Sequence, residues 1–173
     1  MEIYAILTEI IDLRSFSNLW FWIVLAVQWS MASHWPLGVP FDLIQRARRK
    51  GGSAQDDLEA MARVSVNRML HISQISGAWM AGILAFLLTG LAILGFGYGI
   101  EFAQALFCLM FPMVLASGLT LRAAHRIASG ENHGAPLIHR LMMLRLSVQG
   151  LGMVAILATT MWGMWVNLRI GPI

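Results

Sequence analysis

Four long apolar stretches constrain this chain more than any other feature of its sequence. They cover about residues 19–35, 70–96, 102–121 and 141–166. A helix needs about 20 apolar residues to cross a hydrocarbon core roughly 30 Å thick. Only 12% of the 173 residues are charged, against about 25% in soluble domains. The sequence therefore predicts an all-α integral membrane protein, with four transmembrane helices in one bundle and a single domain over residues 1–173.

The basic residues fix an expected orientation for these helices. Of the twelve Lys and Arg residues, nine lie within residues 36–69 and 122–140, and Arg145 lies five residues beyond the second of these segments; only Arg14 and Arg169 lie elsewhere. Basic segments of membrane proteins stay on the cytoplasmic side. We therefore expect a multi-pass membrane protein, with residues 36–69 and 122–140 in the cytoplasm and both termini on the opposite side, in the periplasm or the exterior.

The densest basic cluster has an expected partner in the lipid. Its members are Arg46, Arg48, Arg49 and Lys50. Basic side chains next to transmembrane segments attract anionic headgroups, so we expect this cluster to contact membrane lipids. The sequence has a pI near 9.8, but the basic residues flank apolar stretches, and no nucleic-acid partner is expected.

Three local patterns predict structure outside the four stretches. Residues 2–13 place apolar side chains on one helical face, which predicts an amphipathic helix in the membrane interface. Arg46–Lys50 followed by Gly51-Gly52 indicates a turn, and Ser53 with Asp56 resembles a capping box. No helix breaker lies between Ala54 and His71, so a cytoplasmic helix is expected to extend the second apolar stretch.

Histidine is the one residue type whose placement suggests a ligand site. His34, His71, His125 and His139 each lie at the expected cytoplasmic end of a different apolar stretch. Imidazoles from facing helices can ligate haem iron in a bundle, bind a metal or relay protons. Histidines at helix ends are also suited to the headgroup region. If the histidines only serve the headgroup region, no cofactor is predicted. If they form a ligand site, the alternative cofactor is haem b.

Small and polar residues within the stretches indicate helix–helix contacts. Ser73 with Gly77, and Ala78 with Gly82, give the second stretch a small-residue stripe for close packing, either inside the bundle or against another subunit. Arg145 lies about one turn inside the fourth stretch, where it reaches for the headgroups or pairs with an acid or anion of a partner. Each stretch also carries one glutamine, expected to hydrogen-bond across helices: Gln28, Gln74, Gln104 and Gln149.

Two segments carry a resemblance to a known family. IDLRSFSNLW (residues 11–20) and ASHWPLGVPF (residues 32–41) resemble small four-span membrane proteins of Rhodobacter-like alphaproteobacteria. Those proteins are labelled "component of SufBCD complex", a name tied to iron–sulfur cluster assembly. The resemblance extends over most of the chain and implies an accessory role in an alphaproteobacterial inner membrane. It transfers no catalytic residues, and Cys108 is the only cysteine in the sequence.

The function expected from these patterns is that of a non-catalytic subunit. The sequence has no P-loop, dinucleotide fingerprint, nucleophile elbow or zincin motif, so no enzyme is predicted. We expect an accessory or assembly subunit of a larger inner-membrane complex, such as a respiratory or photosynthetic one. The alternatives are an electron-transfer bundle that binds haem b or a quinone, and a small helper subunit of a transporter.

Overall fold

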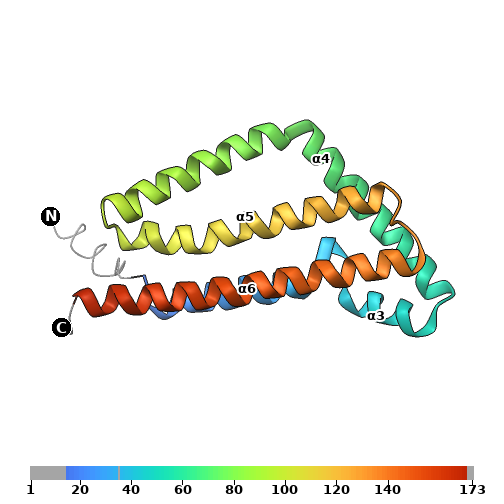
Figure 1. Ribbon diagram of the computed structural model, residues 1–173, viewed down its shortest axis with the longest axis horizontal. Helices are drawn as coiled ribbons and strands as arrows, with labels where there is room; N and C mark the ends of the chain where they lie inside the picture. Colours follow the sequence, from blue (N-terminus) through green and yellow to red (C-terminus); the bar gives the residue numbers. More distant parts are fainter. Residues whose placement is uncertain (1–14, 35, 171–173) are drawn as a thin grey trace, which may run out of the picture.

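The computed structural model describes residues 15–34 and 36–170, and in these residues the regular structure is entirely helical (Figure 1). The amphipathic helix expected over residues 2–13 lies outside the described residues. The elements in chain order are α2 (Leu19–His34), the 3-10 turn η1 (Pro36–Gly38), α3 (Phe41–Lys50), α4 (Ser53–Ala92), the π-helical turn η2 (Ile93–Gly97), α5 (Glu101–Ala128) and α6 (Gly134–Ile170).

Three of these helices are long and apolar enough to cross a membrane: α4 continued by η2, α5 and α6. This confirms an all-helical fold and indicates a multi-pass membrane protein. The fourth expected crossing is not shown in the same way. Its helix, α2, has 16 residues, which corresponds to a length of about 24 Å at 1.5 Å per residue.

The helix expected to extend the second apolar stretch is present, because α4 runs without interruption for 40 residues. Its start differs from the prediction. The capping box on Ser53 was wrong, since Gly52 is the N-cap and its carbonyl accepts bonds from the backbone N–H groups of Gln55 and Asp56. Gly52 has φ 53°, a left-handed conformation that glycine adopts without steric cost. Ser53 is therefore already helical.

The turn expected at Arg46–Lys50 was also wrong, because these residues form the second half of α3. The helix buries one apolar face made by Leu43, Ile44 and Ala47, and its basic residues lie on the exposed side. The turn is confined to Gly51 and Gly52, which both have positive φ. The three apolar side chains, buried at helical spacing, thus keep the basic residues helical up to the glycines.

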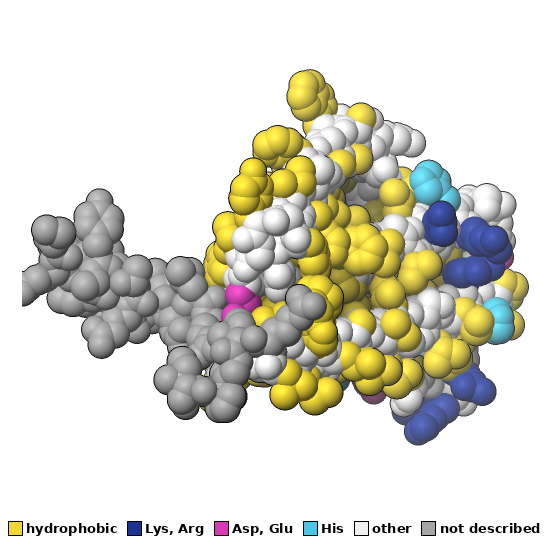
Figure 2. Space-filling view, turned by 60° about the vertical axis from the view of Figure 1, so that its left-hand side comes forward, with side chains coloured by type: hydrophobic (Ala, Val, Ile, Leu, Met, Phe, Trp, Pro, Cys, Tyr) yellow, Lys and Arg dark blue, Asp and Glu magenta, His cyan; other side chains and the backbone are white. Residues whose placement is uncertain are grey.

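The helices run back and forth between two chemically different ends. The start of α2, the junction of η2 with α5 and the end of α6 lie at one end, whereas α3, the start of α4 and the α5–α6 loop lie at the other (Figure 1). Figure 2 shows the Lys and Arg side chains of the visible face gathered at one end, apart from a broad apolar surface. Both basic segments therefore share one end of the molecule.

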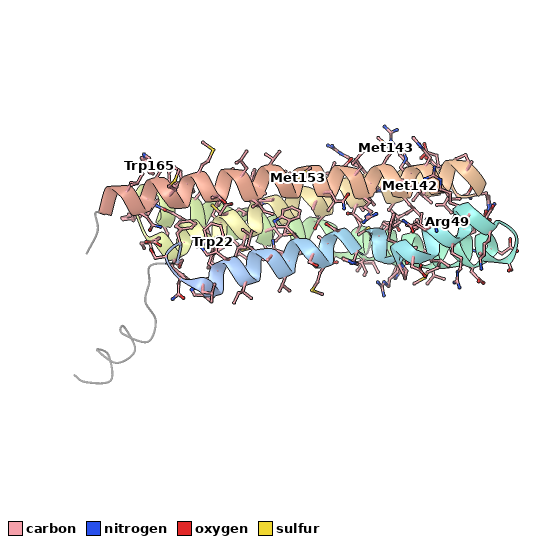
Figure 3. The ribbon with its side chains drawn as sticks, turned by 90° about the horizontal axis from the view of Figure 1, so that it is seen from below. Trp22, Arg49, Met142, Met143, Met153 and Trp165 are labelled. Atoms are coloured by element: carbon pink, nitrogen blue, oxygen red, sulfur yellow. The ribbon has the colours of Figure 1, made fainter. Side chains whose placement is uncertain are left out.

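The core lies along α6, between α2 on one side and α5 on the other. Figure 3 shows α2 alongside α6, with Trp22 and Trp165 near one end and Arg49 and Met142 near the other. Phe21, Leu25 and Trp29 are the buried side chains of α2. Tryptophan at one end and basic residues at the other suit the two headgroup regions of a bilayer.

Candidate functional site

The apolar part of α4 is the least covered membrane segment of the protein. We name residues 70–92 the α4 arm. Only 6% of the most apolar window of this helix is buried, compared with 33% for α5 and 28% for α6. Ile75, Trp79 and Phe86 are 69%, 78% and 77% exposed. The described chain therefore covers α5 and α6 several times better than it covers the α4 arm.

The small-residue stripe predicted on this arm does not pack inside the described molecule. Ala78 and Gly82 are exposed, and Ser73 and Gly77 are half-buried. A Cβ atom added to Gly82 would meet nothing within 4 Å, and one added to Gly77 would contact only Ser73 of the same helix. The space above these residues is therefore open to lipid or to another subunit.

The close packing that glycine permits occurs on α6 instead. A Cβ atom on Gly152 would lie 2.7 Å from the Trp29 ring, and one on Gly163 would lie 3.2 Å from the Phe16 ring. Both glycines are buried against α2 or the residues just before it. Ala155 and Thr159 of the same helix instead line a pocket shared with α5. The packing roles of Gly152 and Gly163 were not predicted from the sequence, in which they resemble the other glycines of the apolar stretches.

Arg145 is satisfied within the protein. Its Cζ lies 3.4 Å from the centre of the Phe41 ring, and its Nε donates a hydrogen bond to the Ser33 carbonyl at 3.3 Å. The guanidinium thus joins α6 to the end of α2 and the start of α3. Aromatic and carbonyl contacts of this kind lower the cost of a cation near the membrane. These contacts give Arg145 a supporting role inside the protein, and its pairing with an acid or anion of a partner stays a prediction.

The four candidate histidines are not brought together at a buried site. His34, His71, His125 and His139 are all exposed. His34 has its Nδ1 2.9 Å from the Ser30 carbonyl of its own helix. Among residues 15–34 and 36–170 there is no group of three or more His, Cys, Asp or Glu side chains that could hold a metal ion. A haem between helices needs buried ligands, and these four positions do not supply them.

A fifth histidine takes part in a polar junction at the basic end. Glu59, in the polar first part of α4, accepts hydrogen bonds from His133 Nδ1 at 2.8 Å, from the Gly134 backbone N–H at 2.8 Å and from Gln55 at 3.1 Å. The carboxylate thus sits at the N-terminus of α6, where the helix dipole favours negative charge. The bonds from His133, Gly134 and Gln55 lower the pKa of Glu59 from 4.5 to about 2.

The loop between α5 and α6 is stabilised by a second ionic contact. The Arg140 guanidinium makes two hydrogen bonds to the Glu131 carboxylate, one of them 2.6 Å long. Such a bidentate pair is geometrically specific. The hydrogen bond from Arg140 lowers the pKa of Glu131. The two junctions together hold the start of α6 against α4 and against its own loop.

Two of the four glutamines bridge helices, as the sequence predicted. Gln28 of α2 donates to the Leu109 carbonyl of α5 at 3.0 Å. That carbonyl lies three residues before Pro112, whose ring disturbs the helical hydrogen bonds nearby. Gln104 of α5 donates to the Gly95 carbonyl at 2.7 Å and accepts from Trp162 at 3.0 Å. A membrane interior leaves backbone groups no water, so these amides satisfy them.

The other two glutamines make no hydrogen bond with the described residues. Gln149 is half-buried, and Gln74 is exposed near the start of the α4 arm. An exposed amide on an otherwise apolar arm offers a polar contact to a neighbouring helix. Gln74 therefore adds to the uncovered character of this surface.

Comparisons of the chain with protein-family models, with curated proteins and with solved structures gave no match. The fold is helical, with three helices long and apolar enough to cross a membrane among the described residues, and the function has to be inferred from the contacts described above.

Proposed function

We propose that this protein is a non-catalytic accessory or assembly subunit of a larger inner-membrane complex, and that the α4 arm is its docking surface. The observation that carries the proposal is the 6% burial of the most apolar window of α4. The arm offers large side chains such as Trp79 and Phe86 for contact, and small residues such as Gly82 that let another helix approach closely.

The topology that fits this role has four crossings. In it, α2 completes the bundle beside α6, and the shared basic end faces the cytoplasm. A crossing helix about 24 Å long is accommodated by local thinning of the bilayer and by its flanking side chains. Both termini then lie in the periplasm. Helix α3 and the first turns of α4 then extend from the bundle on the cytoplasmic side.

Purification from the native membrane tests the proposal. The tagged full chain is extracted in mild detergent, and co-eluting subunits are identified and quantified by mass spectrometry. We expect stoichiometric large membrane subunits with the unmodified chain. With the double variant Trp79→Ala/Phe86→Ala, the amount of large subunits recovered per tagged chain is expected to fall about tenfold or more, because aromatic side chains dominate interface energies.

A matched control removes two large exposed side chains from another helix. Met153 and Leu157 of α6 are 68% and 62% exposed, and the variant Met153→Ala/Leu157→Ala is expected to keep the partner. Equal losses in both variants, or a wild-type protein that elutes alone, contradict the docking role. A Soret band that stays with this chain after it is separated from the co-eluting subunits contradicts the non-catalytic assignment in favour of the electron-transfer alternative.

A further inference from the structure

A groove with a volume of about 210 Å³ lies between α5 and α6 at the basic end. Its lining comes from both helices. Arg122, Arg126 and Arg140 supply its charged part, and Leu119, Met143 and Leu144 supply its apolar part. Three arginines from two neighbouring helices thus line one groove.

The groove carries more positive charge than its neighbours neutralise. Arg140 is paired with Glu131. The side chains of Arg122 and Arg126 are exposed and make no hydrogen bond or ion pair with the described residues, although the charge of Arg126 lies close enough to Glu131 to help lower the pKa of that carboxyl. Two guanidinium groups therefore remain available for an anion, and their planar donor sets suit phosphate oxygens.

The depth of the groove relative to the apolar stretches indicates the kind of anion. Arg122 directly follows the apolar stretch of α5, and Arg140 directly precedes that of α6. Both arginines thus lie where the hydrocarbon ends and the headgroups begin. Leu119, Met143 and Leu144 lie about one helical turn deeper, at acyl-chain depth. The arginines thus lie at the depth of a phospholipid headgroup, and the apolar side chains below them lie at the depth of its acyl chains.

We propose that this groove binds the phosphate of an anionic phospholipid from the cytoplasmic leaflet, with the first part of an acyl chain along Leu119 and Met143. Basic pockets between membrane helices are suited to such headgroups. A free phosphate ion would leave the apolar wall unused. A zwitterionic lipid brings its own cation into a site that already holds unpaired arginines. The inference is independent of the partner complex proposed above.

Lipid titration of the full-length protein tests this site. The protein is purified in a neutral detergent and titrated with phosphatidylglycerol, and bound lipid is counted by native mass spectrometry. Phosphatidylglycerol is expected to bind more tightly than phosphatidylcholine. The variant Arg122→Gln/Arg126→Gln is expected to weaken phosphatidylglycerol binding roughly 25-fold, because each arginine near an anionic headgroup contributes about a factor of five.

Two further variants keep the result interpretable. Arg63→Gln/Arg68→Gln removes two exposed arginines from α4, outside the groove, and is expected to change binding less than about threefold. Arg122→Lys/Arg126→Lys keeps the charges and is expected to retain most of the binding.

Three outcomes overturn the proposal. Unchanged binding in the Arg122→Gln/Arg126→Gln variant places the lipid elsewhere. An equal loss in the Arg63→Gln/Arg68→Gln variant reduces the effect to overall charge. Displacement of the lipid by inorganic phosphate at equal concentration identifies a site for a free anion.

Discussion

The guanidinium of Arg145 stacks on the ring of Phe41, with Cζ 3.4 Å from the ring centre. These residues belong to α6 and α3, which are separated by most of the chain. The contact holds the basic surface helix α3 against the bundle. Among the described residues no acid forms an ion pair with Arg145. The cation–π contact and the hydrogen bond from Arg145 to the Ser33 carbonyl therefore supplement the buried apolar face of α3 at this corner of the fold.

Replacing Phe41 by leucine is expected to lower the free energy of unfolding by about 1–2 kcal/mol, because a partly desolvated cation–π contact contributes up to about that amount. Denaturant titration in mild detergent measures the change. The variants Phe41→Leu and Arg145→Gln, combined in a double-mutant cycle, are expected to show a coupling of about 1 kcal/mol. Additive effects of the two substitutions would contradict the contact.

Acid is expected to loosen the junction between α4 and α6 through Glu59. Its pKa is lowered to about 2 in the folded protein from 4.5, so the carboxylate stabilises the fold above about pH 4.5. This stabilisation is lost as the pH falls from about 4.5 to 2. Thermal midpoints at pH 7, 4 and 2.5 measure the effect, and Glu59→Gln is expected to be less stable at pH 7.

The exposed acid Asp57 on the same helix provides the control for that experiment. Asp57→Asn is expected to follow the wild-type pH dependence, since Asp57 makes no hydrogen bond with the described residues. A Glu59→Gln variant as stable as wild type at pH 7 would show that the junction does not support the fold.

The contact of Gly152 with α2 predicts opposite outcomes for two glycines of one helix. Gly152→Ala places a methyl group against the Trp29 ring and is expected to destabilise the protein by about 1–3 kcal/mol through overpacking. A Cβ atom on Gly150 meets nothing within 4 Å, so Gly150→Ala is expected to be neutral or stabilising by up to about 1 kcal/mol. Thermal midpoints in detergent compare the two variants.

Cysteine labelling measures the orientation of the two ends. In a Cys108→Ala background, Lys50→Cys reports on the basic end and Tyr98→Cys on the opposite end; both residues are exposed. A membrane-impermeant maleimide added outside the cytoplasmic membrane is expected to label position 98 and leave position 50 unlabelled. The reverse labelling pattern would contradict the proposed topology. Labelling at both positions would indicate leaky membranes, and the experiment is then repeated in sealed vesicles of each orientation.

The sequence predicted features that depend on composition along the chain. The absence of breakers between Ala54 and His71 correctly predicted the continuous α4. Three of the four long apolar runs correctly predicted helices long enough to cross a membrane, and the crossing over residues 19–35 stays a prediction. The bridging roles of Gln28 and Gln104 followed from the cost of an unpaired amide in hydrocarbon. Each of these inferences needs only local sequence and the properties of the solvent.

Features that depend on helix rotation were not predictable. Lipid is as apolar as a protein core, so a membrane helix carries little periodic signal for its buried side. The glycines of α4 and α6 therefore look equally suited to packing, although a helix lies against Gly152 and none of the described residues covers Gly82. Because the rotation of each helix is not encoded in this pattern, the sequence also could not predict which way each histidine faces or that Phe41 lies against Arg145.

The hydrogen bonds of Glu59 and Gln104 attach α4 and the turn that follows it to the rest of the protein on both sides of the α4 arm. Glu59 holds the start of α4 against α6, and Gln104 holds the turn after its end through the Gly95 carbonyl. A Cβ atom on Gly95 would lie 2.9 Å from the backbone nitrogen of Gln104, so the turn after α4 packs closely against α5. Glu59 lies in the polar part of α4, before the arm begins at residue 70, and Gly95 lies just after the arm ends at residue 92. In the docking role proposed above, attachments on both sides of the arm would leave association fewer degrees of freedom to order, so that more of the contact energy would remain as affinity.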